Sequence, residues 1–144
     1  MSLLAHLIKP PEDVYKRQAY NRAVLLMAVM EKRGGINLSS SDVYVNVIGG
    51  IQLDEPAADL SIVLAAASSY RDTPISDSLV AIGEVGLTGE IRAVSNLSVR
   101  LAEVARLGFQ SCMVPRQGTD HLQAPEGLRL IRVRNLREAI EVAL

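Results

Sequence analysis

Aromatic side chains are scarce in this chain. Only 3% of its 144 residues are aromatic, with no Trp and one Phe, so few rings are present on which nucleic-acid bases could stack. Hydrophobic residues nevertheless make up 49% of the sequence, and the core must therefore be built from Ala, Val, Leu and Ile, as in closely packed α/β layers. At this length we expect one folded domain with a substantial core.

Cysteine pairs, a net charge of one sign and long apolar runs are also lacking. Cys112 is the single cysteine, which excludes a disulfide framework, and in "QSCMVP" it is expected to be a buried small hydrophobe. The formal net charge of −1 excludes a globally basic nucleic-acid binder but leaves room for a basic face. No apolar stretch is long enough for a bilayer and no signal peptide is evident, so we predict a cytoplasmic protein with no membrane partner.

The usual metal and phosphate motifs are missing as well. His6 and His121 are the only histidines and have no ligand spacing. Neither GxxxxGK[ST] nor a GxGxxG after a strand occurs, and the glycines of "GEVGLTGE" are better explained as turn residues. We therefore predict no metal site and no cofactor in this chain.

The first eighteen residues resemble material added during cloning or sequence assembly. "MSL" is typical of an expression-vector start, and "DVYKRQ" can be back-translated into a sequence that resembles a transposon-end adaptor. We predict that residues 1–18 are a non-native leader and that the domain occupies residues 19–144.

What remains alternates helical and strand patterns, which is typical of an α/β domain of two or three layers. Asn21 and Asn135 are expected to cap the first and last helices, and Gly34 and Gly108 to stop the first and third. The predicted helices are 21–33, 55–70, 97–107 and 136–144, and the predicted strands are 42–51, 110–115 and 128–133, with two further short strands around "GEVGLTGEI".

Acidic residues and a proline open the second predicted helix in "LDEPAADL". Asp54, Glu55 and Pro56 suit a helix N-terminus, where free N–H groups and the positive end of the dipole lie. General acid–base work by these acids together with Asp59 or Glu84 is the less favoured alternative. Enzymes often place a serine or cysteine at such a turn, whereas this chain has Ala57.

Three stretches together identify a family. "DVYVNVIGGIQLDEPAADLSIVLAAASSYRDTPI", "AIGEVGLTGEIRAV" and "RLAEVARLGFQSCMVP" closely resemble the C-terminal domain of the bacterial RadA (Sms) family, from about Tyr20 to Leu144. That domain is similar to the proteolytic domain of Lon proteases. The resemblance implies an α/β fold of the ribosomal protein S5 domain 2-like, Lon proteolytic-domain type.

The Lon resemblance explains the alanine. Lon carries its nucleophile in "PKDGPSAG", where this chain has "QLDEPAAD", so Ala57 falls on the serine position. Its general-base lysine lies in "GGLKEK", where this chain has "SNLSVR", so Arg100 falls on the lysine, and Ile82 replaces a Lon threonine. Alanine has no oxygen to attack a carbonyl and arginine stays charged, so the resemblance implies a pseudo-protease without catalytic residues.

The RadA resemblance implies a role in DNA recombination and repair. In that family the whole protein is an ATP-dependent branch-migration motor that joins a zinc finger, a RecA-like ATPase domain and this domain. ATP, Mg²⁺ and Zn²⁺ would be bound by domains outside this chain. The expected partners of the chain are further copies of itself in a hexameric ring, DNA, and the RecA-like ATPase domain.

Basic residues around the first and third helices are the candidates for contact with DNA phosphates. They are Arg22, Lys32, Arg33, Arg92, Arg100 and Arg106. For Arg100 an ion pair with Asp54, Glu55 or Glu84 is the competing interpretation. Two alternatives to a DNA-binding scaffold remain open: an assembly module without DNA contact, and residual hydrolysis by an unrecognised dyad.

Overall fold

The computed structural model describes residues 5–6, 14–38, 44–45 and 55–144, and side chains within 21–38 and 55–144. It shows a mixed α/β domain. Its elements are β1 (Ala5–His6), α1 (Val14–Arg33), β2 (Tyr44–Val45), η1 (Pro56–Ala58), α2 (Asp59–Arg71), β3 (Leu79–Ala81), β4 (Glu84–Val85), β5 (Ile91–Arg92), α3 (Leu97–Arg106), β6 (Ser111–Pro115), β7 (Arg129–Val133) and α4 (Leu136–Ala143). Apart from Tyr44 and Val45, the strand predicted at 42–51 lies outside the described residues.

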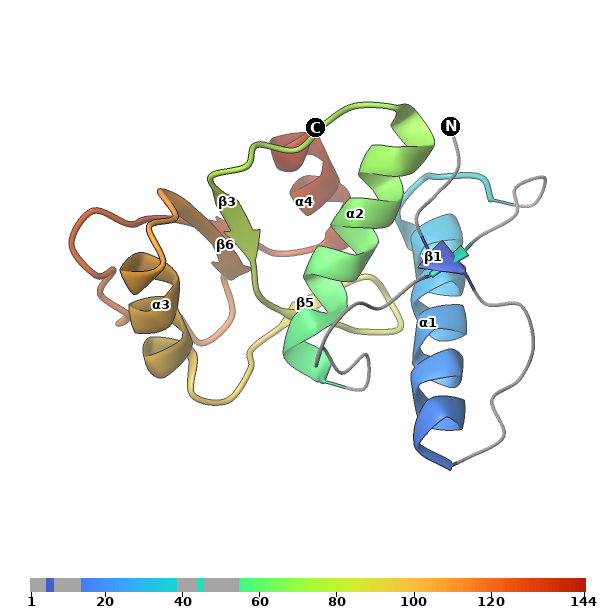
Figure 1. The fold of residues 1–144 in the computed structure, drawn as a ribbon, viewed down its shortest axis with the longest axis horizontal. Helices are drawn as coiled ribbons and strands as arrows, with labels where there is room; N and C mark the ends of the chain where they lie inside the picture. The colour runs from blue at the N-terminus through green and yellow to red at the C-terminus, as the bar shows by residue number, and fades with distance from the viewer. Residues whose placement is uncertain (1–4, 7–13, 39–43, 46–54) are drawn as a thin grey trace.

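A three-stranded parallel sheet lies at the centre, in the order β3-β6-β7. Helix α3 covers one face of this sheet, α2 and α4 cover the other, and α1 stands beyond α2 (Figure 1). Two smaller antiparallel pairs, β1-β2 and β4-β5, complete the strands described.

The strands alternate between two hydrophobic clusters. Cys112 and Val114 of β6 pack with Leu101 and Val104 of α3, whereas Met113 packs in the larger cluster that α1, α2 and α4 share. This period of two places an apolar face on each side of the sheet. Both faces are covered by helices, as is usual for parallel strands.

Helix α1 begins earlier than predicted. The sequence places its N-cap at Asn21, but the helix starts at Val14, inside the segment expected to be a leader. No glycine or proline interrupts 14–33, and the added residues include good helix formers such as Lys16 and Ala19, so Asn21 becomes an interior position. The predicted end at Arg33 is confirmed, with the Gly34 N–H bonded to the Met30 carbonyl at 2.9 Å.

The segment around "GEVGLTGEI" forms three strands where two were predicted. β3 joins the parallel sheet, and β4 and β5 form a separate hairpin. The predicted role of its glycines is confirmed, since the Gly86 N–H bonds the Glu90 carbonyl at 2.9 Å and Gly89 has φ of +85°. A left-handed residue at this turn favours glycine.

The C-terminal half follows the sequence closely. Helix α3 ends two residues before Gly108, whose φ is +93°, and β6 ends at Pro115. The Asn135 side chain accepts a hydrogen bond from the Glu138 N–H at 2.8 Å, which confirms Asn135 as the N-cap of α4. None of the described helices combines the length and hydropathy needed to cross a bilayer.

Candidate functional site

Backbone hydrogen bonds hold Ala57 against the segment between β3 and β4. Pro56 opens a short 3₁₀ helix, η1, and the α-helix predicted from Glu55 begins only at Asp59 as α2. The Ala57 carbonyl accepts a hydrogen bond from the Gly83 N–H at 3.0 Å. The Leu60 N–H donates in return to the Gly83 carbonyl at 3.1 Å. A Cβ on Gly83 would lie 2.8 Å from Ile91 Cγ2, so this close approach requires glycine.

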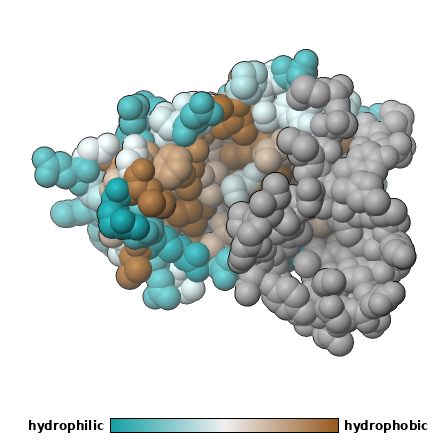
Figure 2. All heavy atoms as spheres, viewed as in Figure 1, coloured by the Kyte–Doolittle hydropathy of each residue, from teal (hydrophilic) through white to brown (hydrophobic). Residues whose placement is uncertain are grey.

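A cleft of about 560 Å³ opens beside Ala57, between η1 with α2 on one side and α3 on the other. Figure 2 shows apolar side chains gathered on this face of the molecule, between α3 and α2. The cleft is lined by Glu55, Ala57, Ala58, Ser61, Ala81, Ile82, Val99, Arg100, Glu103 and Val104. The three positions picked out by the Lon resemblance, Ala57, Ile82 and Arg100, therefore line one cavity.

Arg100 forms an ion pair across this cleft. Its Nη2 lies 3.0 Å from Glu55 Oε1, and its Nε donates to the Ser95 carbonyl at 3.0 Å. Glu84 pairs with Arg92 instead, and Asp54 lies outside the described residues. The side chains of Arg100 and Glu55 are 32% and 46% exposed, so water can reach this pair.

The lining of the cleft offers one hydroxyl group besides water-accessible carboxylates. Ser61 Oγ donates to the Ala58 carbonyl at 2.9 Å, one turn back along the helix. Neither lysine nor histidine is among the described residues that line the cleft. A serine nucleophile needs a base within hydrogen-bond reach, whereas the hydrogen bond of Ser61 goes to a backbone carbonyl and not to Glu55 or Glu103.

A second arginine–carboxylate pair lies at the start of α2, and no motif in the sequence predicts it. Asp59 is fully buried and accepts from Arg22 Nε at 3.0 Å, from Arg22 Nη2, and from the Val85 N–H at 3.1 Å. Burial raises the pKa of the Asp59 carboxyl, while Arg22 and the Val85 N–H act in the opposite direction. The hydrogen bond to Asp59 raises the pKa of Arg22.

This geometry gives Arg22, a candidate for DNA contact, a structural partner that links α1 to α2. Arg92 pairs with Glu90 at 3.1 Å and with Glu84 at 3.6 Å. Arg106 pairs with Glu103 one turn earlier on α3. Of the six candidates, Lys32 and Arg33 are the two without an ion pair in the described part of the chain.

Cys112 behaves as the sequence predicts. It is fully buried on β6, and burial raises the pKa of its thiol to about 12. A thiol that stays protonated in an apolar cluster is inert, so the interpretation as a small hydrophobe is confirmed. Within the described ranges no three His, Cys, Asp or Glu side chains come together as a metal site would require.

Comparisons with known proteins place the chain in a family. The profile of a family described as "Subunit ChlI of Mg-chelatase" matches residues 19–118, which is more than half of the chain. The chain belongs to this ChlI family. The ChlI match begins at residue 19, directly after the predicted leader of residues 1–18. That these residues are a non-native leader stays a prediction.

Relatives named "DNA repair protein RadA" cover most of the chain. The protein of Bacillus subtilis is 49% identical over 125 residues, which are 87% of this chain and 27% of that protein. Those of Synechocystis and Escherichia coli are 44% and 43% identical over 87% and 85% of the chain, and 24% and 26% of their own lengths. The predicted resemblance to RadA is confirmed, and the chain spans about a quarter of these relatives.

The name of the ChlI family refers to Mg-chelatase, but the residues of this chain do not fit a site for a nucleotide or a metal ion. The sequence has no P-loop motif to cradle nucleotide phosphates. The described side chains form no cluster of metal-binding groups.

Proposed function

We propose that this chain is a proteolytically inactive, Lon-like module of a DNA repair protein, with an S5 domain 2-like fold. In this proposal it assembles into a hexameric ring and helps to hold DNA. One observation carries it: Ala57 and Arg100, which fall on the serine and lysine of a Lon dyad, line the same cleft, where Arg100 pairs with Glu55. The names of the relatives supply the link to DNA repair.

The chemistry of these two side chains supports the loss of proteolysis. A Ser-Lys dyad needs an oxygen that attacks the carbonyl and an amine that takes up its proton. The methyl group of Ala57 can do neither, and the guanidinium of Arg100 does not release its proton at ordinary pH. Because nucleophile and base act as a unit, restoring one alone leaves the reaction blocked.

A hydrolysis assay tests this part directly. Casein and an acyl ester should turn over at background rates with the wild type and with Ala57→Ser, since that variant still lacks a base. Ser61→Ala is the matched control, because Ser61 is the hydroxyl that lines the cleft. Turnover by the wild type that Ser61→Ala abolishes would show a dyad that our interpretation denies, and would overturn the proposal.

The scaffold role needs a separate measurement. We expect light scattering to give a hexamer, and titration with duplex DNA to give an affinity that falls steeply between low and moderate salt. Several copies of a modest basic cluster in a ring would together neutralise many phosphates, and each released counterion adds to the salt dependence. A monomer at all concentrations, or salt-independent DNA binding, would contradict this role.

A specific observation favours a second candidate, an assembly module without DNA contact. Four of the six basic candidates, Arg22, Arg92, Arg100 and Arg106, already pair with carboxylates of the chain. In that case the same titration gives a hexamer that does not bind duplex DNA at low salt.

The remaining expectations concern the whole protein. We propose that the chain operates next to a RecA-like ATPase domain in a branch-migration motor, and that ATP, Mg²⁺ and Zn²⁺ are bound by that domain and by a zinc finger. A cytoplasmic location belongs to the same proposal. The relatives support it in so far as they are named DNA repair proteins and are about four times as long as the matched region.

A further inference from the structure

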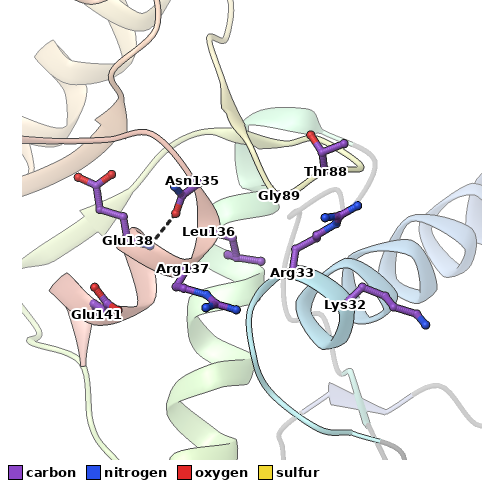
Figure 3. A pocket seen from close by; sticks show the side chains of 9 residues that line it. All are labelled: Lys32, Arg33, Thr88, Gly89, Asn135, Leu136, Arg137, Glu138 and Glu141. Carbon is purple, nitrogen blue, oxygen red and sulfur yellow. Dashed lines mark hydrogen bonds between the residues drawn. The ribbon is translucent and has the colours of Figure 1, made fainter.

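A second cleft lies away from Ala57, where α1 ends and α4 begins. It has a volume of about 460 Å³ and also contacts the tip of the β4-β5 hairpin (Figure 3). It is lined by Lys32, Arg33, Thr88, Gly89, Asn135, Leu136, Arg137, Glu138 and Glu141. Three of these side chains are cationic and come from two helices that are far apart in sequence.

The hairpin tip brings these helix ends together. The Leu136 N–H donates to the Gly89 carbonyl at 2.7 Å, which ties the start of α4 to the hairpin. On the other side Gly89 packs against Arg33, and a Cβ on Gly89 would lie 2.8 Å from Arg33 Cβ. Arg137 follows the fully buried Leu136, so its side chain emerges beside the end of α1.

In the described part of the chain, the three cations of this cleft are unpaired, unlike the arginines that line or flank the cleft beside Ala57. Within the described residues, the side chains of Lys32, Arg33 and Arg137 form no ion pair and no hydrogen bond. Positive charge in the cleft therefore has no carboxylate bound to it.

The two carboxylates of the lining leave that charge unbalanced. Glu138 is turned back toward the helix start, where its Oε2 accepts from the Arg134 N–H at 3.0 Å. In Figure 3 its side chain lies on the far side of α4 from Arg33. Glu141, one turn further along α4, pairs with no described side chain.

Stabilisation of the helices explains only part of this arrangement. Lys32 and Arg33 lie in the last turn of α1, where cations interact favourably with the helix dipole. Arg137 lies in the first turn of α4, where the dipole disfavours a cation. The helix dipole therefore does not account for Arg137, which lines the same cleft as Lys32 and Arg33 from the opposite side.

We propose that this cleft binds a phosphate-bearing anion through Arg33 and Arg137, with Lys32 at its edge. Guanidinium groups bind phosphate oxygens through paired, charge-assisted hydrogen bonds. The helix start contributes little, because the N–H groups of Leu136 and Glu138 are already bonded to Gly89 and Asn135. An anion site here does not depend on the loss of proteolysis at Ala57, but its nucleic-acid form rests on the proposed contact with DNA, for which Lys32 and Arg33 are candidates.

Titration of the full chain with inorganic phosphate tests the proposal, with backbone amide NMR shifts as the readout. We expect shifts confined to the end of α1, the hairpin tip and the start of α4. Arg33→Ala and Arg137→Ala should each weaken binding about tenfold, since each removes charge-assisted hydrogen bonds. Unchanged amide spectra away from the cleft would show that both variants remain folded.

Two further variants sharpen the result. Arg116→Ala removes one exposed positive charge in the loop between β6 and β7, where the Arg116 side chain has no partner among the described residues. Because this charge lies outside the cleft, the variant should leave the phosphate affinity within about twofold of the wild type. Glu141→Gln removes a negative charge from the cleft and should strengthen binding. Equal losses in Arg116→Ala and Arg137→Ala, or weaker binding in Glu141→Gln, would overturn the proposal.

The source of the phosphate is distinguished by a second ligand. If Arg137→Ala weakens binding of inorganic phosphate and of duplex DNA alike, and pyrophosphate displaces the duplex, the cleft binds a nucleic-acid phosphate. If only the small anions are affected, it binds a free phosphate or a phosphorylated metabolite. Both results support an anion site, whereas absence of phosphate shifts at low salt contradicts one, whatever the hydrolysis assay gives.

Discussion

Two arginine–carboxylate pairs flank the start of α2, and they differ chiefly in their exposure to water. Arg22 holds Asp59 between α1 and α2, with side chains that are 23% and 0% exposed. Arg100 meets Glu55 across the cleft, with side chains that are 32% and 46% exposed. The residue types are alike, but one pair lies largely in the packed interior and the other in the solvent-exposed lining of the cleft beside Ala57.

This difference decides what each pair contributes. A buried carboxylate has lost its hydration, so its charge depends on the arginine and on the Val85 N–H. An exposed pair exchanges its partners with water at little cost and is screened by salt. We therefore assign structural importance to Arg22 and leave Arg100 available to another anion.

Removal of Arg22 should have the largest effect. Arg22→Met leaves the Asp59 carboxylate buried without a cation, and we expect the free energy of unfolding to fall by about 3–5 kcal/mol. Urea denaturation measures the loss. Combining Arg22→Met with Asp59→Asn removes the stranded charge and keeps an oxygen for the Val85 N–H, so it should recover part of that loss. A double variant less stable than Arg22→Met would contradict our account.

The loss in Arg22→Met should also depend on pH. Burial already raises the pKa of Asp59, and without Arg22 that pKa rises further above its unfolded value. A carboxyl group whose pKa is higher in the folded than in the unfolded state stabilises the folded state at low pH. That stabilisation is lost as the pH rises through the folded-state pKa. The penalty of Arg22→Met relative to wild type should therefore shrink as pH falls toward the ordinary carboxyl range. Urea midpoints at a series of pH values measure this, and a constant penalty would argue against it.

Arg100→Ala should have a much smaller effect on stability. We expect a loss of less than about 1 kcal/mol, because its pair with Glu55 is open to water. Weaker binding of duplex DNA with unchanged thermal stability would indicate contact between Arg100 and phosphate. Lost stability with unchanged DNA binding would indicate that the ion pair is its main role. Glu55→Gln is the matched control, since it frees Arg100 without removing its charge.

Arg106→Ala should change stability least. Arg106 and Glu103 form an exposed pair one turn apart on α3, and they bridge no separate elements of the fold. We expect the thermal midpoint to match that of the wild type. A drop as large as that of Arg22→Met would mean that burial does not separate the strong pairs from the weak ones.

Local patterns allowed much of the fold to be predicted. The ends of α1 and α3, the Asn135 cap and the burial of Cys112 each depend on a few neighbouring residues, and the sequence indicates them correctly. The start of α1 was predicted too late, because a good N-cap residue can also occupy a helix interior.

The candidate sites were less accessible to such reasoning. Only the resemblance to Lon predicted that Ala57 and Arg100 lie together, because they fall on the two positions of its dyad. No local rule relates residues that are forty-three positions apart. In the sequence Asp59 stood out only as a possible acid–base carboxylate, and no motif singled out Arg137. Arg22, which binds Asp59, and Arg33, which shares a cleft with Arg137, lie far away in the sequence, so no pattern along the chain could bring them together.

The sequence by itself determined which groups are present: a methyl where a nucleophile would stand, a permanent cation where a base would stand, and a single cysteine suited to a core. Only the tertiary structure decided which arginine lies against which anion or cleft. The burial and the convergence of side chains arise from packing between distant segments. They determine whether a charged group is paired in the interior, exposed in the lining of a cleft or free to bind a ligand.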